Sequence, residues 1–377
     1  MKKRFEFIVV GGGIAGASVS YRLIDFGETV LLEMEEQPGY HSTGRSAAQY
    51  TELYGNASIR ALVRLSNEFF TSPPNGFTES PILMPRGAMF IATGKQRHAI
   101  DTFLDMARQE NCLVRELDVA GARDVVPVLR ASAFESAVLE LESTDIDVHA
   151  LHGGYLRGFR AGGGEIVTNA EARMIERVDG NWRVETPAGE FEAPVLVNAA
   201  GAWGDVIARR AGVEELGLQA KRRTVILFEP PQGENILDWP LVIDAEENWY
   251  FKPEAGVILA SPADETPTDP CDAQPEDIDI AIVADAIERM TTMEVGRILN
   301  SRAGLRTFVK DKSPVVGFAP DAPGFFWLVG QGGYGIETSP AISVVAANLI
   351  VRGRLPVEFT NTGITDEVLS PRRLLGI

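Results

Sequence analysis

The chain has 377 residues, a length typical of two domains, and 45% of them are hydrophobic and 23% charged, as in a globular protein with a sizeable core. A formal net charge of −18 argues against a nucleic-acid partner, because its phosphates would be repelled. Two cysteines and four histidines predict neither a disulfide framework nor a metal site, and the chain has no run of 18 apolar residues that would predict a transmembrane segment. We therefore expect a cytoplasmic protein, with peripheral docking of its basic tail at the inner face of the membrane left open.

The N-terminal residues contain a strand, a glycine-rich turn and a helix. The continuous apolar run Phe7–Val10 predicts a strand buried on both faces. It is followed by Gly11, Gly13 and Gly16 in the order G-x-G-x-x-G, which open a helix predicted over residues 14–26. The first glycine permits the tight turn, the second lets the backbone approach a pyrophosphate, and the third lets the helix pack closely against the strand. The free N–H groups at the start of the helix are also suited to phosphate.

A second strand completes this pattern. Gly27 is expected to end the helix, and the apolar run Thr29–Leu32 predicts a strand that ends at Glu33. An acidic side chain at this point can accept hydrogen bonds from the ribose of an adenine dinucleotide. The glycine pattern alone is weak, because it often occurs by chance. A preceding strand, a following helix and an acid at the right distance together predict dinucleotide binding.

The middle of the chain alternates between helices and strands. The hydroxyl-rich loop 37–46 is suited equally to contact with a cofactor and to an ordinary surface position, and a short helix is predicted after it over 47–50. Further helices are predicted over 58–70, from the N-cap Asp147, and over 278–290.

Two strands predicted in the second half of the chain are candidates to border a functional site. Residues 194–201 predict a buried strand that runs into a glycine, so we expect it beside the first strand of the chain. Residues 221–228 predict a strand in which Arg223 and Val225 share one face. The strands around it predict a mixed or antiparallel sheet inserted between segments of the nucleotide domain.

The last predicted strand, Phe325–Val329, is followed by a second glycine loop and a helix, which Thr338 or Ser339 is expected to cap and Gly353 to end. Two glycine loops more than 300 residues apart fit a long cofactor, and a flavin dinucleotide requires both, whereas NAD would not. We therefore predict an α/β protein with a discontinuous Rossmann-like FAD-binding domain and an inserted α+β substrate-binding domain. The FAD-binding domain is predicted over residues 1–80, 145–215 and 310–377, and the substrate-binding domain over 81–144 and 216–309.

Five sequence motifs are spread along the chain, in the order GGGIAGAS, HSTGRSAAQY, VNAAGAWG, AGLRTF and VGQGGYGIETSP. Together they resemble the D-amino-acid oxidase-like superfamily of FAD-dependent oxidoreductases, and most of all its bacterial D-arginine and related D-amino-acid dehydrogenases. The likeness covers nearly the whole chain. It implies FAD bound without a covalent bond, since no cysteine follows Cys271. It leaves open whether oxygen or a quinone-type molecule accepts the electrons.

The resemblance assigns cofactor contacts to residues at both ends of the chain. The ADP half of FAD would be bound by Gly11, Gly13, Gly16 and Glu33, and the pyrophosphate and flavin would lie along Arg45, Ser46, Ala47, Gln49 and Thr51. Gly201 would follow the second nucleotide strand, and the flavin ring would lie near Gly332, Gly333, Gly335, Glu337 and Thr338. The positive end of the last helix would stabilise negative charge on the reduced flavin.

The resemblance also implies four catalytic residues. Arg223 and Arg306 would clamp a substrate carboxylate, with Tyr54 and Tyr250 beside the substrate. Guanidinium groups match a carboxylate, so they can fix an amino acid by its acid end and direct the α-hydrogen at flavin N5. Hydride transfer gives an imine, which hydrolyses to a 2-oxo acid and ammonia. Without the resemblance, either arginine is better explained as a solvated or structural ion pair.

The chain departs from the D-arginine dehydrogenases where those enzymes bind a cationic side chain. They have an acid two residues after a Pro-Arg pair, whereas here Pro85-Arg86 is followed by Gly87 and Ala88. Gln49 replaces a usual histidine, and Glu337 replaces a usual amide. A buried guanidinium without a counter-charge is costly, so the pattern favours D-amino acids with neutral or apolar side chains. The side-chain pocket is predicted to be lined by Met84, Ala88, Met89 and Trp249.

Several alternatives stay open at this point. Glu337 offers a substitute charge for a basic substrate. A secondary-amine oxidase of the sarcosine or glycine type, or a 2-hydroxy-acid oxidoreductase, would use the same carboxylate-binding arginines. A flavin-binding protein without turnover is disfavoured, because Arg223, Tyr250 and Arg306 would then have no role.

Overall fold

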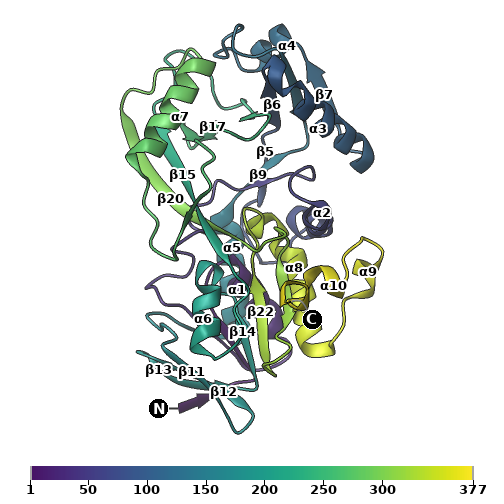
Figure 1. Cartoon of the computed structure of the whole chain (residues 1–377), viewed down its shortest axis with the longest axis vertical. Coiled ribbons are helices and arrows are strands. Elements are labelled where there is room, and N and C mark those ends of the chain that lie inside the picture. The colour runs from purple at the N-terminus through teal and green to yellow at the C-terminus, as the bar shows by residue number, and fades with distance from the viewer. Residues whose placement is uncertain (1, 376–377) are drawn as a thin grey trace.

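The computed structural model describes residues 2–375 and places two large sheets along its longest axis (Figure 1). The lower half of Figure 1 contains a six-stranded sheet whose neighbouring strands are parallel except for the edge pair β21–β22. Its strands lie in the order β10 (Glu165–Val167), β3 (Thr29–Leu32), β2 (Phe7–Val10), β14 (Val195–Asn198), β22 (Phe325–Val329) and β21 (Val315–Phe318). The expected neighbour relation of the first strand and the 194–201 strand is confirmed, since β14 pairs with β2.

The two faces of this sheet contribute to separate hydrophobic cores. Along β2, Ile8 and Val10 pack with helix α6 (Gly204–Arg210), whereas Phe7 and Val9 pack with helix α1 (Ile14–Leu23). Because successive side chains of a strand point to opposite faces, a continuous apolar run serves both cores. The sheet is therefore covered on both sides, as the sequence predicts.

Two smaller sheets flank it. The four-stranded sheet at the bottom of Figure 1 lies against the α6 side, and the three-stranded sheet lies toward the upper half. The first has the order β1 (Lys2–Arg4), β13 (Gly189–Ala193), β12 (Asn181–Thr186) and β11 (Met174–Val178), and the second β4 (Gln49–Tyr50), β9 (Thr144–Ile146) and β5 (Leu83–Pro85).

The upper half of Figure 1 contains a nine-stranded mixed sheet, in which β6 and β16 are the parallel pair. All of its strands come from residues 88–140 and 219–308, inside the segments predicted for substrate binding. The order is β19 (Thr266–Thr268), β15 (Gln219–Phe228), β18 (Val257–Ser261), β17 (Tyr250–Glu254), β16 (Leu241–Asp244), β6 (Ala88–Ala92), β8 (Ser136–Glu140) and β7 (Val114–Leu117), and β20 (Ile298–Phe308) pairs with β15.

The predicted helices after residue 50 are present, with small changes at their ends. Helix α5 (Val148–Ala161) begins after Asp147, whose carboxylate accepts a hydrogen bond from the N–H of Ala150, as an N-cap should. The other α-helices after residue 50, besides α6, are α2 (Ala57–Thr71), α3 (Arg97–Glu110), α4 (Val119–Val125), α7 (Asp277–Met290), α8 (Gly335–Arg352), α9 (Val357–Thr360), α10 (Asp366–Leu369) and α11 (Arg372–Leu375). Within residues 2–375, no helix is long and apolar enough to cross a membrane.

Three local predictions are wrong. Helix α1 ends at Leu23 instead of reaching Gly27. Residues 49–50 form strand β4 and not a helix, because they pair with β9, almost 100 residues further along the chain. Helix α8 begins at Gly335, so Thr338 lies inside it and its hydroxyl donates to the carbonyl of Tyr334. Gly353, in contrast, ends α8 in the left-handed conformation as predicted.

Candidate active site

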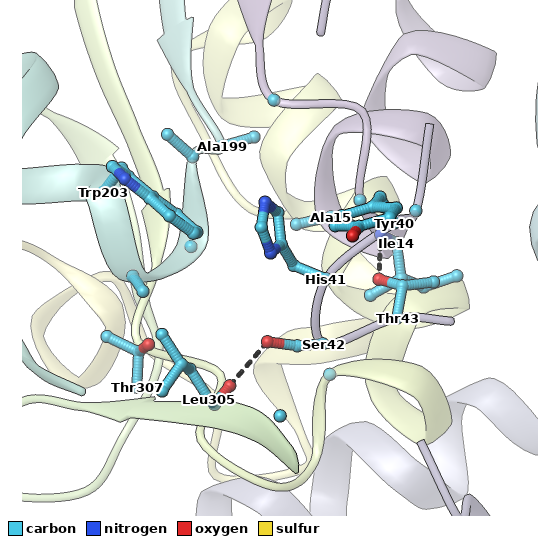
Figure 2. Close-up of a pocket in the computed structure, with 18 of the residues that line it drawn as sticks. Ile14, Ala15, Tyr40, His41, Ser42, Thr43, Ala199, Trp203, Leu305 and Thr307 are labelled. Atoms are coloured by element: carbon cyan, nitrogen blue, oxygen red, sulfur yellow. Dashed lines mark hydrogen bonds between the residues drawn. The ribbon is translucent and has the colours of Figure 1, made fainter. Parts of the chain in front are cut away.

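One long cavity runs from the carboxyl ends of β2 and β14 to the face of the nine-stranded sheet. Its walls include the first glycine turn, the loop 39–47, the end of β14, strands β15, β17 and β20, and the glycine loop before α8. Figure 2 shows part of it, with the loop 39–47 between helix α1 and β20. A crevice at the carboxyl ends of parallel strands is the usual ligand site in α/β folds.

The first glycine turn is packed so closely that it leaves no room for side chains. Gly11 has φ +106°, and a Cβ at this residue would lie 2.5 Å from the carbonyl oxygen of Ala199. A Cβ at Gly16 would lie 1.8 Å from the carbonyl oxygen of Gly11. Gly13 is the residue before α1 and lines the cavity. The turn therefore presents bare backbone and a helix N-terminus to the cavity, as a bound pyrophosphate requires.

Glu33 lies beside this turn at the end of β3. Its side chain is buried, yet it borders the cavity, and it accepts hydrogen bonds from the N–H groups of Gly12 (2.8 Å) and Glu35 (2.9 Å). Burial raises the pKa of Glu33, and these two backbone hydrogen bonds oppose that effect. A carboxylate held in this way has lone pairs left for ribose hydroxyls.

The loop 39–47 supplies residues that the sequence patterns do not single out. Thr43 accepts a hydrogen bond from the N–H of Ile14 (2.9 Å), and Ser42 donates to the carbonyl of Leu305 (2.7 Å; Figure 2). The ring of His41 lies 4.6 Å from that of Trp203, and Figure 2 shows the two facing each other. Both rings border the cavity, so they are further candidates for cofactor contact. Their only signal in the sequence is their position inside two of the five motifs.

The residues predicted to follow the pyrophosphate have different positions. Ser46, Ala47 and Gly201 border the cavity. Arg45 also borders it, but its guanidinium donates to the carboxylate of Asp272 and to the carbonyls of Ala273 (2.9 Å) and Ala303 (3.0 Å). Arg45 therefore fastens the loop 39–47 to the loop before α7.

Gln49 and Thr51 lie outside the cavity wall. The Gln49 amide donates to the carbonyl of Gly87 (3.1 Å), and the Thr51 hydroxyl lies 2.8 Å from a carboxylate oxygen of Glu140. Gly16, Glu337 and Thr338 are likewise behind the wall. These five residues would therefore act on a cofactor only indirectly, by holding in place the elements that border the cavity.

The second glycine loop brings backbone against a guanidinium group. Gly332, Gly333 and Gly335 border the cavity, and a Cβ at Gly333 would lie 2.7 Å from Nη1 of Arg306. A side chain at residue 333 would therefore displace the Arg306 guanidinium from this loop. Gln331 also borders the cavity, and its Nε2 is buried without a hydrogen-bond partner. Such a donor needs an acceptor, which the carbonyl or phosphate oxygens of FAD would supply.

Arg223 and Arg306 are brought together by strand register. Arg223 on β15 is opposite Gly304 on β20, so Arg306, two residues further on, shares its face as a diagonal neighbour. Both border the cavity, as does Tyr250 on β17. Arg306 donates to the hydroxyl of Tyr54 (3.2 Å) and, in the described part of the chain, makes no ion pair. Arg223 donates to the carbonyl of Asp264 (2.9 Å), and its Nη2 lies 3.6 Å from Glu265.

The predicted side-chain pocket is wrong. Met84 is 47% exposed on β5, and Met89 and Trp249 are buried in the core between the nine-stranded sheet, α4 and α7. Ala88 is buried and does not border the cavity. The alternation of side chains along a strand explains the error, since Tyr250 faces the cavity and its neighbour Trp249 must face the other side.

A second hollow adjoins Arg223 and is acidic. It is bordered by Arg223, Ala245, Glu246, Glu247, Ala263 and Glu265. Three carboxylates against one guanidinium disfavour a second negative group on any ligand that extends from Arg223 into this hollow.

Several solved structures match the fold of this chain over nearly its whole length. The structure of glycine oxidase from Geobacillus kaustophilus matches with a TM-score of 0.83 at 19% identity, over 96% of this chain and 99% of that one. NikD, an amino acid oxidase essential for nikkomycin biosynthesis, matches with a TM-score of 0.84 at 13% identity, over 98% of both chains. Iminodiacetate oxidase from Chelativorans sp. BNC1 matches with a TM-score of 0.79 at 20% identity, over 97% of this chain and 99% of that one.

Curated sequences are similar along nearly the whole chain. Mitochondrial dimethylglycine dehydrogenase of Rattus norvegicus is 24% identical over 95% of this chain and 44% of its own length. Mitochondrial sarcosine dehydrogenase of Homo sapiens is 24% identical over 92% of this chain and 40% of its own length. The chain thus spans less than half the length of these relatives. The profile of the FAD dependent oxidoreductase (DAO) family matches residues 6–349, and the glycine turns, Glu33 and Gln331 fit FAD. The chain therefore belongs to the DAO family of FAD dependent oxidoreductases.

Proposed function

We propose that this oxidoreductase deaminates D-amino acids with neutral or apolar side chains. Arg306 carries the proposal, because its partly buried guanidinium faces a cofactor cavity and has no carboxylate partner among residues 2–375. Such a group is suited to an anionic ligand. Arg223 on the neighbouring strand offers a second fork beside it. The α-carboxylate of an amino acid is the ligand that matches both groups.

The chain's own residues would bind and orient the substrate. Arg306 and Arg223 would hold its carboxylate, Tyr54 would keep Arg306 in place through their hydrogen bond, and Tyr250 would border the substrate. Bound FAD supplies the hydride acceptor. Fixing the acid end in this way restricts the positions of the α-carbon and the amine, and such positioning contributes much of an enzyme's rate enhancement.

The side-chain preference now rests on charges alone. The acidic hollow beside Arg223 disfavours D-aspartate, D-glutamate and similar acids, which leaves neutral side chains and basic ones. Because that hollow would tolerate an ammonium group, D-arginine and D-lysine are the substrates most able to contradict the proposed preference.

A second candidate function is oxidation of an N-methyl glycine. It is favoured by the relatives named as sarcosine and dimethylglycine dehydrogenases. Such substrates carry the same carboxylate, so the two arginines fit them equally well. We propose this reaction as the alternative, and oxygen or a quinone-type molecule as the electron acceptor in either case.

Anaerobic reduction of the bound FAD by a substrate panel decides between these reactions. The panel includes neutral, basic and acidic D-amino acids, their L-forms, sarcosine, glycine and 2-hydroxy acids, and bleaching of flavin absorbance is followed. We expect neutral D-amino acids to bleach the flavin fastest and to release ammonia with a 2-oxo acid. Bleaching by sarcosine with formaldehyde release, and by no D-amino acid, would establish the alternative. Fastest bleaching by D-arginine would overturn the neutral preference.

A further inference from the structure

Two buried acids are joined through one threonine behind the cavity wall. Glu140 at the end of β8 and Glu337 in α8 each expose only 3% of their surface. The Thr51 hydroxyl lies 2.8 and 2.9 Å from the two carboxylate oxygens of Glu140, and the Thr51 N–H donates to Glu337 across 3.4 Å. Within residues 2–375, neither acid forms an ion pair.

The charges that face this pair do not neutralise it. Burial is the main influence on both acids, and it raises the pKa of Glu140 to about 7 and that of Glu337 well above its ordinary value. Glu140 raises the pKa of Glu337 further, whereas Arg306 on β20 lowers it. The other titratable groups around the two acids are Glu52, Glu142, Tyr50, Tyr334 and Cys112.

The position of Glu337 connects the pair to the cofactor cavity. Glu337 lies in the first turn of α8, directly after Gly335 and Ile336, which border the cavity. The start of a helix carries partial positive charge, and an ionised acid in the first turn cancels part of it. A neutral Glu337 leaves that positive end available to negative charge in the cavity.

We propose that Glu337 keeps a proton of its own beside the Glu140 carboxylate and that this proton keeps the start of α8 electropositive when the bound FAD is reduced. The inference requires FAD binding but not the proposed substrate. Two-electron reduction with uptake of one proton gives an anionic reduced flavin. Once Glu337 has lost its proton at high pH, the new negative charge on the flavin draws a second proton from solvent back to Glu337.

The test is the midpoint potential of the bound FAD as a function of pH, measured anaerobically against a reference dye without any substrate. The wild type and the Glu337→Gln variant should coincide at acidic pH, where residue 337 is neutral in both. At higher pH the wild-type potential should fall more steeply, by one additional factor of ten in the reduction equilibrium per pH unit, or about 30 mV. Protonation of the reduced flavin itself would have the opposite effect, because the plot of potential against pH would become shallower as the pH rises.

Two variants separate the proposal from a merely structural role. Glu140→Gln removes the like charge next to Glu337, so the steep section should begin at lower pH than in the wild type. Glu52→Gln, a neighbouring acid outside the pair, should leave the steep section in place. A steep section that survives in Glu337→Gln, or a constant offset at every pH, would overturn the proposal. If the Glu337→Gln variant does not bind FAD, the Glu140→Gln variant is sufficient as a test. A pH dependence of its midpoint potential identical to that of the wild type would overturn the proposal.

Discussion

The two ends of the cavity are built by different means. At the nucleotide end, Gly11 and Gly16 present backbone packed at contact distance, and the whole turn is formed within ten residues of chain. At the other end, Arg223, Arg306 and Tyr250 come from three strands, and they offer charge and hydroxyl groups on side chains.

The two ends of the cavity should therefore be sensitive to different kinds of substitution. The nucleotide end depends on volume, because a carbon added at Gly11 or Gly16 meets a backbone carbonyl oxygen at less than 3 Å. The other end depends on charge, because Arg306, Glu140 and Glu337 have little water around them to screen them. Substitutions that change volume should therefore be severe at the first end, and substitutions that change charge or pH at the second.

Gly16→Ala should have the largest effect. Its Cβ would lie 1.8 Å from a backbone oxygen, so we expect a loss of more than about 100-fold in FAD affinity, since overpacking of this kind exceeds the usual cost of about 1–3 kcal/mol. Titration of the apoprotein by flavin fluorescence measures the affinity, and circular dichroism reports the fold. Gly296→Ala is the matched control, because a Cβ there meets no atom within 4 Å. Unchanged affinity in Gly16→Ala would show that the turn is not tightly packed.

The charged end should depend on pH through Glu140. Its pKa is raised by burial from 4.5 to about 7, so it stabilises the folded state below pH 4.5 relative to higher pH, and this contribution is lost as the pH rises through 7. The loss corresponds to about 3 kcal/mol. The glutamine in Glu140→Gln cannot ionise. Its free energy of unfolding, from urea titrations between pH 4.5 and 8.5, should therefore rise relative to that of the wild type by this amount as the pH increases. Parallel curves would mean that Glu140 is not desolvated.

The sequence predicts these two ends unequally well. The strand, glycine turn and helix at Gly11 are local, so spacing along the chain was enough to predict them, and the structure confirms both strands. The proximity of Arg223 and Arg306 depends on the register of β15 with β20 across more than 80 residues, which only the family resemblance could anticipate. The prediction of the side-chain pocket is wrong for the same reason. Which face of a strand Met89 or Trp249 occupies is set by its partners in the sheet, and nothing in the local sequence reports it.

Arg306→Lys should lower kcat/KM for the preferred substrate by about 10- to 100-fold, mainly through KM. Lysine keeps the charge but loses the planar fork, and hydrogen bonds to charged groups are worth about 1.5–3 kcal/mol. Steady-state kinetics measure the effect, while FAD affinity should not change. Arg108→Lys, on the exposed surface of α3, is the control. Normal kcat/KM in Arg306→Lys would remove the clamp from the proposed function.

Asp272→Asn should have the smallest effect, and it tests the connection between the two ends. Asp272 accepts from Arg45, so it ties the loop 39–47 near the nucleotide end to the loop before α7. Asp272 is 46% exposed, and exposed ion pairs contribute about 1 kcal/mol at most, so FAD should dissociate less than about fivefold faster. The difference should disappear at high salt, where the pair is screened, and Asp269→Asn should show none. An effect that persists at high salt would mean that Asp272 acts through packing, and the two ends would then be coupled by volume as well as by charge.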